Sequence, residues 1–290
     1  MSKLKTSTLL LTCLSFALAI APTAARGQAP GSRIFTTIDV PGATETDCND
    51  VNINGTIVGF YIDSALVSHG FLRAQGTFTT IDFPGATATL AYGINDSSQV
   101  VGWYTDSGGI THGYMLNKST FTTIDPPGST FTNAWGINNA GAIVGTYIGS
   151  DGLFHGFTDN NGTFTTVNVP GSTLTYVTGV NNLGQMVGIF DDSAAVEHGY
   201  SLTAGKFTPI VFPGSALTAS DRINDAGEVV GLWGTSAAGP FTGYAKFGGT
   251  YDAVMVPGST ETRCRGVNNK GEIVGRYTDS AGVIHGYSTH

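Results

Sequence analysis

Apolar and polar residues alternate in short runs along most of this chain, and each run stops at a turn signal. Residues 78–120 contain four such runs, which end at Pro-Gly, Asn-Asp, Asp-Ser-Gly-Gly and Asn-Lys. Alternation with a period of two indicates β-strands, and clusters of Gly, Pro, Asn and Asp indicate turns. The pattern therefore predicts four short strands in this stretch.

The same unit recurs along the chain, with spacings of 43, 43, 43, 43 and 44 residues between its first residues, Phe35, Phe78, Phe121, Phe164, Phe207 and Tyr251. Every unit contains Pro-Gly, then a Thr four residues later, an apolar residue followed by Asn, and an apolar-Val-Gly sequence. A glycine follows the Asn by three residues in five units, and Ser98 replaces it in the second. That spacing suits a hairpin loop that ends in a left-handed residue.

A single four-stranded sheet leaves apolar side chains exposed on its faces, so the units must stack face to face, and closing the stack into a ring removes its unpaired ends. The repeat therefore predicts an all-β, six-bladed β-propeller with four-stranded blades of about 43 residues. The first strand, residues 34–39, has no partners before it, and the last unit, residues 262–289, contains three strands. We expect the N-terminal strand to complete the last blade. The alternative, a solenoid of the same period, would need capping repeats.

The N-terminus differs from the repeats. Lys3 and Lys5 precede an apolar run and then small residues, which is typical of a secretory signal peptide. We expect a signal peptide over residues 1–25, cleaved after Ala25 or alternatively after Ala29, a linker over 26–33 and one propeller domain over 34–290. The protein should be secreted or periplasmic, monomeric and without a membrane anchor. Its net charge of −8 argues against nucleic acid as a partner.

The sequence Gly-Ile-Asn-x-x-Gly-x-x-Val-Gly, followed by a Ser/Asp/Gly turn and His-Gly-Phe or His-Gly-Tyr, resembles the HAF-repeat family of extracellular bacterial proteins. The resemblance covers residues 35–290, with Gly in place of the Ala of His-Ala-Phe. It implies export and a repeat fold, and no particular activity.

Five histidines precede Gly-Phe or Gly-Tyr at the start of the third strand of their units: His69, His112, His155, His198 and His285. Because strands lie ~4.8 Å apart, these side chains should be distant from the axis and from one another. Zinc ligands must all lie ~2 Å from one ion. We therefore expect structural histidines that pair with Asp63, Asp106, Asp192 and Asp279 in the preceding loops, and neither a metal site nor another cofactor.

Cys48 and Cys264 occupy the same position in the first and last units. Ring closure makes those units neighbours, so an exported chain could join its ends by a disulfide between the two. The alternative is that both are free thiols packed in a tight inner layer.

A functional site should lie where the units differ, and they differ most along the innermost strand. Units five, six and one carry charged and polar residues there, whereas units two to four carry aromatic residues. The sequence predicts a central mouth with ligand-binding residues Tyr92, Trp135, Tyr176, Arg263, Arg265 and Asn49. Alternatively, these side chains only plug the channel.

A charged arc and an aromatic arc around one central mouth favour an exported protein that binds a glycan. One alternative is a glycoside hydrolase or polysaccharide lyase, in which Asp47 and Asp221 would be the catalytic carboxylates. A second alternative is a scaffold that binds other proteins. The chain contains neither a Gly-x-Ser-x-Gly nor a His-Glu-x-x-His sequence, so whether it is an enzyme stays open.

Overall fold

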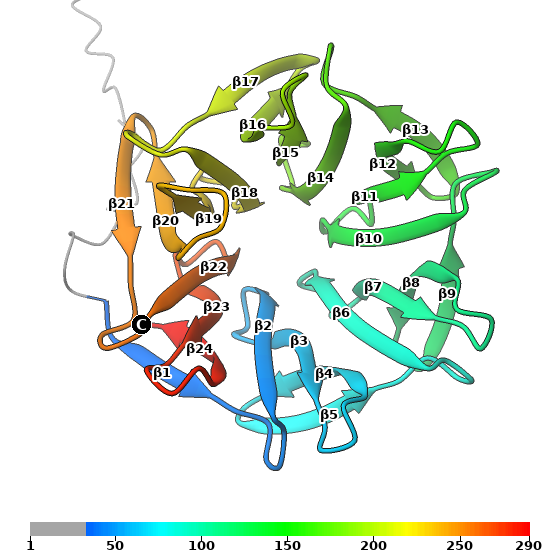
Figure 1. Ribbon diagram of the computed structural model, residues 1–290. Coiled ribbons are helices and arrows are strands. Elements are labelled where there is room, and N and C mark those ends of the chain that lie inside the picture. The colour runs from blue at the N-terminus through cyan, green and yellow to red at the C-terminus, as the bar shows by residue number, and fades with distance from the viewer. Residues whose placement is uncertain (1–32) are drawn as a thin grey trace, which may run out of the picture.

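The computed structural model describes residues 33–290, which form 24 β-strands in six four-stranded antiparallel sheets (Figure 1). The sheets stand around a common axis as the blades of a six-bladed β-propeller, so the predicted fold class is confirmed. The part of the chain that the structure describes has no helix long and apolar enough to cross a membrane. The predicted signal peptide and nearly all of the linker lie outside the described residues.

Within a blade the strands follow one another outward from the axis (Figure 1). Blade 1 contains β2 (Glu45–Val51), β3 (Ile57–Ile62), β4 (Ser68–Ala74) and β5 (Thr77–Ile81). Blade 2 contains β6 (Ala88–Ile94), β7 (Val100–Thr105), β8 (Thr111–Asn117) and β9 (Thr120–Ile124). Blade 3 contains β10 (Phe131–Ile137), β11 (Ile143–Ile148), β12 (Phe154–Asn160) and β13 (Thr163–Val167). Blade 4 contains β14 (Leu174–Val180), β15 (Met186–Asp191), β16 (Glu197–Thr203) and β17 (Lys206–Ile210). Blade 5 contains β18 (Leu217–Ile223), β19 (Val229–Gly234), β20 (Thr242–Phe247) and β21 (Thr250–Val254).

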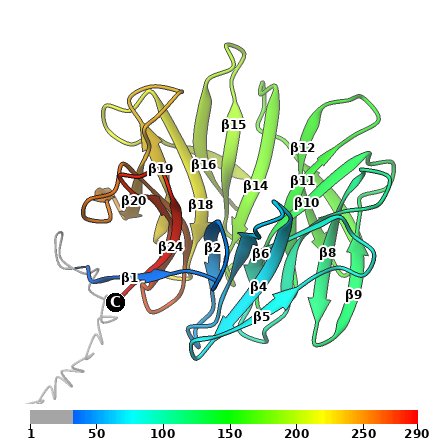
Figure 2. The ribbon, with the colours of Figure 1, turned by 60° about the horizontal axis from the view of Figure 1, so that its bottom comes forward.

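Blade 6 is built from both ends of the described chain. It contains β22 (Glu261–Val267), β23 (Ile273–Thr278) and β24 (Ile284–Thr289), and β1 (Phe35–Ile38) is its outermost strand. The pairing is antiparallel, with Phe35 opposite Thr289 and Ile38 opposite Gly286. Figure 2 shows β1 lying along β24 beside the C-terminus. The predicted closure of the ring by the N-terminal strand is therefore confirmed.

A second closure runs around the axis, where the innermost strands end. The repeated Asn of each blade donates its side-chain amide to the main-chain oxygen of the same Asn in the next blade, at 3.0–3.3 Å. The six bonds form a closed circle through Asn52, Asn95, Asn138, Asn181, Asn224 and Asn268. The side-chain oxygen of each Asn caps its own hairpin, as Asn52 Oδ1 accepts from the amides of Asn54 and Thr56. One residue type thus serves both the turn and the contact between blades.

The hairpin that follows each Asn needs a residue with positive φ. Gly55 has φ = 73° there, and Ser98, which replaces the glycine in blade 2, has φ = 59°. The left-handed region is open to glycine and less favourable for serine, and the predicted loop forms in both cases.

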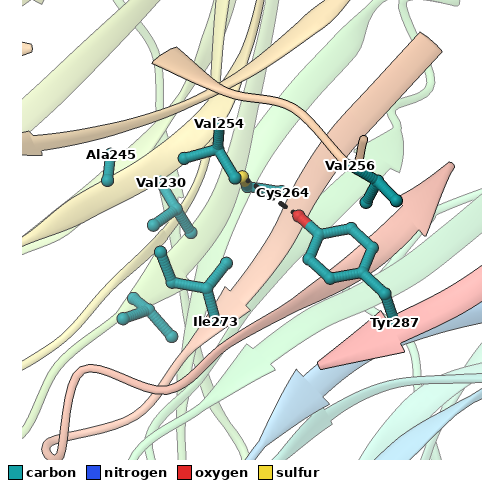
Figure 3. Packing of buried hydrophobic residues seen from close by; sticks show 8 residues of the cluster. Val230, Ala245, Val254, Val256, Cys264, Ile273 and Tyr287 are labelled. Atoms are coloured by element: carbon teal, nitrogen blue, oxygen red, sulfur yellow. Dashed lines mark hydrogen bonds between the residues drawn. The ribbon is translucent and has the colours of Figure 1, made fainter. Parts of the chain in front are cut away.

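The core lies between neighbouring blades and is supplied by the aromatic residue of each His-Gly-aromatic sequence. Tyr287 is fully buried in a cluster in which blade 6 residues pack on Val230 and Val254 of blade 5 (Figure 3). Its ring lies over Gly275, where an added Cβ would come within 3.0 Å of the ring carbon Cε1. The Val-Gly and Gly-aromatic sequences are therefore two halves of one contact, repeated in each blade.

Candidate functional site: a socket at the propeller axis

Each innermost strand carries a β-bulge at its fifth residue. In blade 1, Cys48 lies opposite Gly59 and Asp50 opposite Val58, which leaves Asn49 without a partner residue. A bulge bends the strand and redirects a side chain, and bulges are common next to binding sites. The same shift occurs in all six blades, and the bulge residues are Asn49, Tyr92, Trp135, Thr178, Asp221 and Arg265.

These six residues line one cavity on the axis. Its volume is about 120 Å³, and Tyr176, Ile189 and Arg222 complete its lining. We call this cavity the socket. Six of the eight residues that the sequence assigned to ligand binding or catalysis line it, namely Tyr92, Trp135, Tyr176, Arg265, Asn49 and Asp221.

One side of the socket is an arc of three aromatic rings from blades 2 to 4. Tyr92 meets Trp135 edge to face, with ring centroids 4.4 Å apart at an interplanar angle of 80°. Trp135 and Tyr176 are offset at 6.4 Å and 27°. The indole of Trp135 is fixed by its Nε1, which donates to Thr146 Oγ1 at 3.2 Å. Burial raises the pKa of Tyr92 to about 12, so its hydroxyl stays protonated.

The opposite side of the socket is polar. Arg265 Nη1 donates to Asp221 Oδ1 at 3.3 Å, and Asn49 Nδ2 donates to the main-chain oxygen of Ala91 at 2.8 Å. Burial raises the pKa of Asp221, and the neighbouring guanidinium groups of Arg265, Arg222 and Arg263 oppose that shift. Within residues 33–290, the second oxygen of Asp221, Asn49 Oδ1 and Arg265 Nε have no hydrogen-bonding partner.

The other two predicted site residues lie beside the socket and do not line it. Asp47 is 1% exposed, and its Oδ2 lies 3.4 Å from Arg276 Nη1, which also contacts Glu45 Oε1 at 3.3 Å. Arg263 Nε donates to Glu261 Oε1 at 2.6 Å, and its guanidinium lies 4.9 Å from the centre of the Phe241 ring. Both therefore belong to ion pairs around the socket.

Below the socket the channel narrows to a neck made by the residue that follows each bulge. In four blades this residue is glycine: Gly93, Gly136, Gly179 and Gly266. A Cβ on Gly93 would lie 2.9 Å from the main-chain oxygen of Trp135, and one on Gly266 would lie 2.7 Å from Asp50 Cα. The main chains of adjacent blades are thus too close for side chains at these places.

Blades 1 and 5 carry charged residues at the neck, Asp50 and Arg222. Arg222 Nε lies 3.3 Å from Asp50 Oδ2, and the two side chains are 9% and 10% exposed. The guanidinium of Arg222 also donates to the main-chain oxygens of Tyr92 at 2.5 Å, of Trp135 at 2.6 Å, and of Thr178. The alternative that charged side chains plug the channel therefore describes Asp50 and Arg222, whereas the bulge residues form a cavity above them.

The sequence placed Arg222 among the charged residues of the innermost strands without a role of its own, and two residues of this region, Arg276 and Glu197, were not singled out. Arg222 and Asp50 stand where four other repeats have glycine, a difference that could have identified them. Arg276 is the one charged residue at its position in the second strand of the blades. Glu197 begins β16, opposite Asp191. Burial, with contributions from Asp221 and Asp191, raises its pKa from 4.5 to about 7.

The repeat histidines lie in separate blades and contact carboxylates of their own blade. His112 Nδ1 lies 2.6 Å from Asp125 Oδ2, its Nε2 lies 3.6 Å from Asp106 Oδ2, and the ring stacks on Tyr104. The loop aspartates expected from the sequence contact the histidines of blades 1, 2, 4 and 6. Asp82, Asp125, Asn168 and Asp39 are additional partners. No group of three or more His, Cys, Asp or Glu side chains within residues 33–290 is arranged to hold a metal ion.

The predicted disulfide between Cys48 and Cys264 is not formed, and both residues are buried free thiols. The sulfur of Cys48 faces Gly286 of blade 6, whereas that of Cys264 faces Gly243 of blade 5. Each cysteine packs against the blade that precedes its own, so the two sulfurs point toward different blades. The Cys264 sulfur instead accepts from the Tyr287 hydroxyl at 3.2 Å, and burial raises its pKa to about 12 (Figure 3).

The fold and the cavity define this protein as a six-bladed propeller with a socket on its axis. Two solved proteins, from Aleuria aurantia and Arthrobotrys oligospora, share its fold. The lectin of Aleuria aurantia, solved with Fucα1-6GlcNAc, has a TM-score of 0.53 and 12% identity over 84% of this chain and 91% of its own. AofleA from Arthrobotrys oligospora has a TM-score of 0.56 and 11% identity over 92% and 90%.

A protease domain has the same fold. The β-propeller domain of the Trilobed protease from Pyrococcus furiosus has a TM-score of 0.54 and 9% identity over 85% of this chain and 94% of its own. Identities of 9–12% show a common fold alone. A scan against protein-family models and a search of curated proteins found no match. The resemblance to the HAF-repeat family therefore stays a prediction.

Proposed function

We propose that this protein is exported and binds a glycan in the socket. The observation that carries the proposal is the division of one cavity into an aromatic arc and a polar arc. The flat faces of Trp135 and Tyr176 suit the C–H face of a pyranose, and Asn49, Asp221 and Arg265 can hydrogen bond its hydroxyls. The Aleuria lectin was solved with a fucose-containing disaccharide, which is consistent with sugar binding by this fold. The proposal includes export because of the signal-like N-terminal sequence.

Titration of the protein with a panel of soluble oligosaccharides, followed by tryptophan fluorescence, tests the proposal. We expect a member of the panel to change the emission, and Trp135→Ala to remove the change and weaken binding. Trp233 stacks on Phe212 away from the socket, so Trp233→Phe is the matched control and should leave affinity unchanged. Fluorescence and calorimetry without a response to any sugar would contradict glycan binding and would favour the protein scaffold.

A glycoside hydrolase is the second candidate, and Glu197 favours it. A carboxyl group with a pKa of about 7 can carry a proton at neutral pH, as a general acid must, and Asp221 contributes to that shift. In this case Glu197→Gln or Asp221→Asn should abolish turnover of a bound polysaccharide while binding remains. Unchanged oligosaccharide after long incubation with the native protein would leave binding as its function. Asp47, which is held in the pair with Arg276, is the weaker candidate for catalysis.

A further inference from the structure

We infer that the socket takes the free end of an uncharged glycan, one sugar unit deep, and that acidic sugars are excluded. This inference rests on the proposed function and adds the mode of binding and the class of sugar. It follows from three features: the floor of the socket, its volume, and the pairing of the arginines around it with carboxylates.

The floor is the guanidinium of Arg222. This side chain crosses the neck from blade 5 to Asp50 in blade 1 and to main-chain oxygens of blades 2, 3 and 4. Arg222 lines the socket and also a second cavity, of about 70 Å³, at the other end of the channel. It therefore separates the two cavities. A glycan chain cannot pass along the axis, so whatever enters the socket must end there.

Arg222 is also a positioning residue for the aromatic arc. The oxygens that it binds belong to Tyr92, Trp135 and Thr178, three of the six bulge residues. It also donates to the main-chain oxygen of Asp221 at 3.0 Å. One side chain thus fixes the main chain at four of the six positions that line the socket. Because the bulge residues are held from below, the walls keep their spacing without a ligand.

The volume sets the length of what can be enclosed. Cavities that bury a drug-sized ligand measure roughly 300–1,000 Å³. At about 120 Å³ the socket is well below that range, so it can enclose about one sugar ring. Further units of a chain would lie outside, above the rim. Affinity should therefore be nearly complete with a short oligosaccharide.

The charges around the socket select an uncharged ligand. Arg265 is paired with Asp221, Arg263 with Glu261, and Arg276 with Glu45 and Asp47. Asp191 adds a carboxylate on blade 4, and opposite it Glu197, whose pKa is raised to about 7, is partly ionised at neutral pH. An incoming carboxylate would find no unpaired arginine among these residues and would face several acidic groups, which costs affinity.

Hydroxyl groups match what the polar side offers. Asn49, Asp221 and Arg265 line the socket, and their amide, carboxylate and guanidinium groups offer both acceptors and donors of hydrogen bonds. A sugar hydroxyl can donate and accept at the same time, whereas a carboxylate can only accept.

Calorimetric titration of the full chain with a matched panel tests the inference. The panel contains methyl glycosides of glucose, galactose, mannose, xylose and fucose, their linear oligomers of two to six units, α-cyclodextrin as a glucose chain without ends, and the methyl glycosides of glucuronic and galacturonic acid. For the sugar that binds, we expect the affinities of the dimer and the hexamer to agree within about threefold. The methyl glycosides of the uronic acids should bind at least about tenfold more weakly than the neutral methyl glycoside. α-Cyclodextrin should not bind.

Asp221→Asn provides a second test, because it removes the negative charge beside Arg265. This variant should shift the ratio of neutral to uronic acid affinity by about tenfold toward the acid. Glu261→Gln, which changes a pair outside the socket, is the control and should shift it less. Affinity that rises steadily up to the hexamer, binding of α-cyclodextrin, or equal affinity for the uronic acid would overturn this inference while glycan binding stands. Binding of a uronic acid alone would likewise overturn this inference only, and absence of binding by every member of the panel would overturn both.

Discussion

Asn268 in the last blade donates its side-chain amide to the main-chain oxygen of Asn52 in the first blade, at 3.0 Å. This bond completes the circle of six equivalent bonds and joins the two ends of the propeller close to the axis. Asn268 is 5% exposed. Because the site is buried, removal of the amide would leave its hydrogen-bonding partners unpaired and away from water.

Asn268→Ala should therefore lower the free energy of unfolding by about 1–3 kcal/mol, the usual cost of leaving buried partners unpaired. Urea unfolding followed by circular dichroism measures the change. Asn54→Ala, in an exposed position of the equivalent loop in blade 1, is the control and should change stability by less than about 0.5 kcal/mol. Equal effects of the two substitutions would show that the circle of amides does not stabilise the ring.

The split sixth blade makes a second prediction. Removal of residues 33–41 deletes β1 and exposes the edge of β24, whose main-chain groups then lack partners. We expect a lower melting temperature and concentration-dependent aggregation, measured by scanning calorimetry and light scattering. A chain that starts at residue 33 is the comparison. If the two chains melt within a few degrees of each other, β1 is not needed to close the ring.

The contribution of the Asp50–Arg222 ion pair to stability can be tested by comparison with the other four blades, which have glycine at this position. Arg222→Gly alone leaves Asp50 buried without its partner, which should cost about 3–5 kcal/mol. The double variant Asp50→Gly/Arg222→Gly places glycine at all six neck positions and should recover a large part of that loss. Denaturant unfolding of the native protein, both single variants and the double variant gives the coupling energy. Additive effects would show that the two residues do not act as a pair.

Glu197 gives a pH dependence with a defined sign. Its pKa is raised from 4.5 to about 7, so the folded protein binds this proton more tightly than the unfolded chain does. The contribution to stability is complete below pH 4.5 and is lost as the pH rises through 7. Glu197→Gln should therefore melt at a higher temperature than the native protein at pH 8, with a smaller difference at pH 5. Parallel melting curves of the two proteins across this range would contradict a raised pKa.

The repeated histidines should act in stability and not in ligand binding. His112→Ala removes the contact with Asp125 and the ring that stacks on Tyr104, and we expect a loss of about 1–2 kcal/mol. Affinity for any sugar that binds in the socket should be unchanged, because His112 is in the third strand of its blade. Lys118→Ala, at an exposed position after β8, controls for a general effect of substitution. A loss of affinity together with unchanged stability would place the histidines in the binding site.

The ring could be predicted from the sequence because its requirements recur in every unit. The Thr after each Pro-Gly is an example: Thr46 Oγ1 accepts from the Val40 amide, and Thr89 Oγ1 accepts from the Phe83 amide in the same way. Contacts of this kind lie within one unit or between equivalent residues, so a sixfold alignment contains them.

Contacts across the axis, between blades that are not adjacent, could not be predicted in this way. Arg222 and Asp50 occupy equivalent positions in blades 5 and 1, and their side chains meet because the neck is narrow. The cysteines show the opposite case. Their equivalent positions in adjacent blades suggested a disulfide, but the two side chains point toward different blades and no disulfide forms. Glu197 lies outside the innermost strand, so a comparison restricted to that strand passed over it. The aromatic arc and the polar arc could be predicted from the sequence, because they depend only on which residue types occupy the innermost strands.

The bulge in every innermost strand has a consequence for how such a chain can change. It presents one side chain per blade to the socket, at a position that the repeated contacts of the fold do not use. Substitutions there alter the chemistry of the cavity, while the amide circle, the Pro-Gly turns and the packing between blades remain. Because Tyr92 packs on Trp135 and Arg265 pairs with Asp221, we expect such changes to occur in coupled pairs, with the same fold carrying cavities of different specificity.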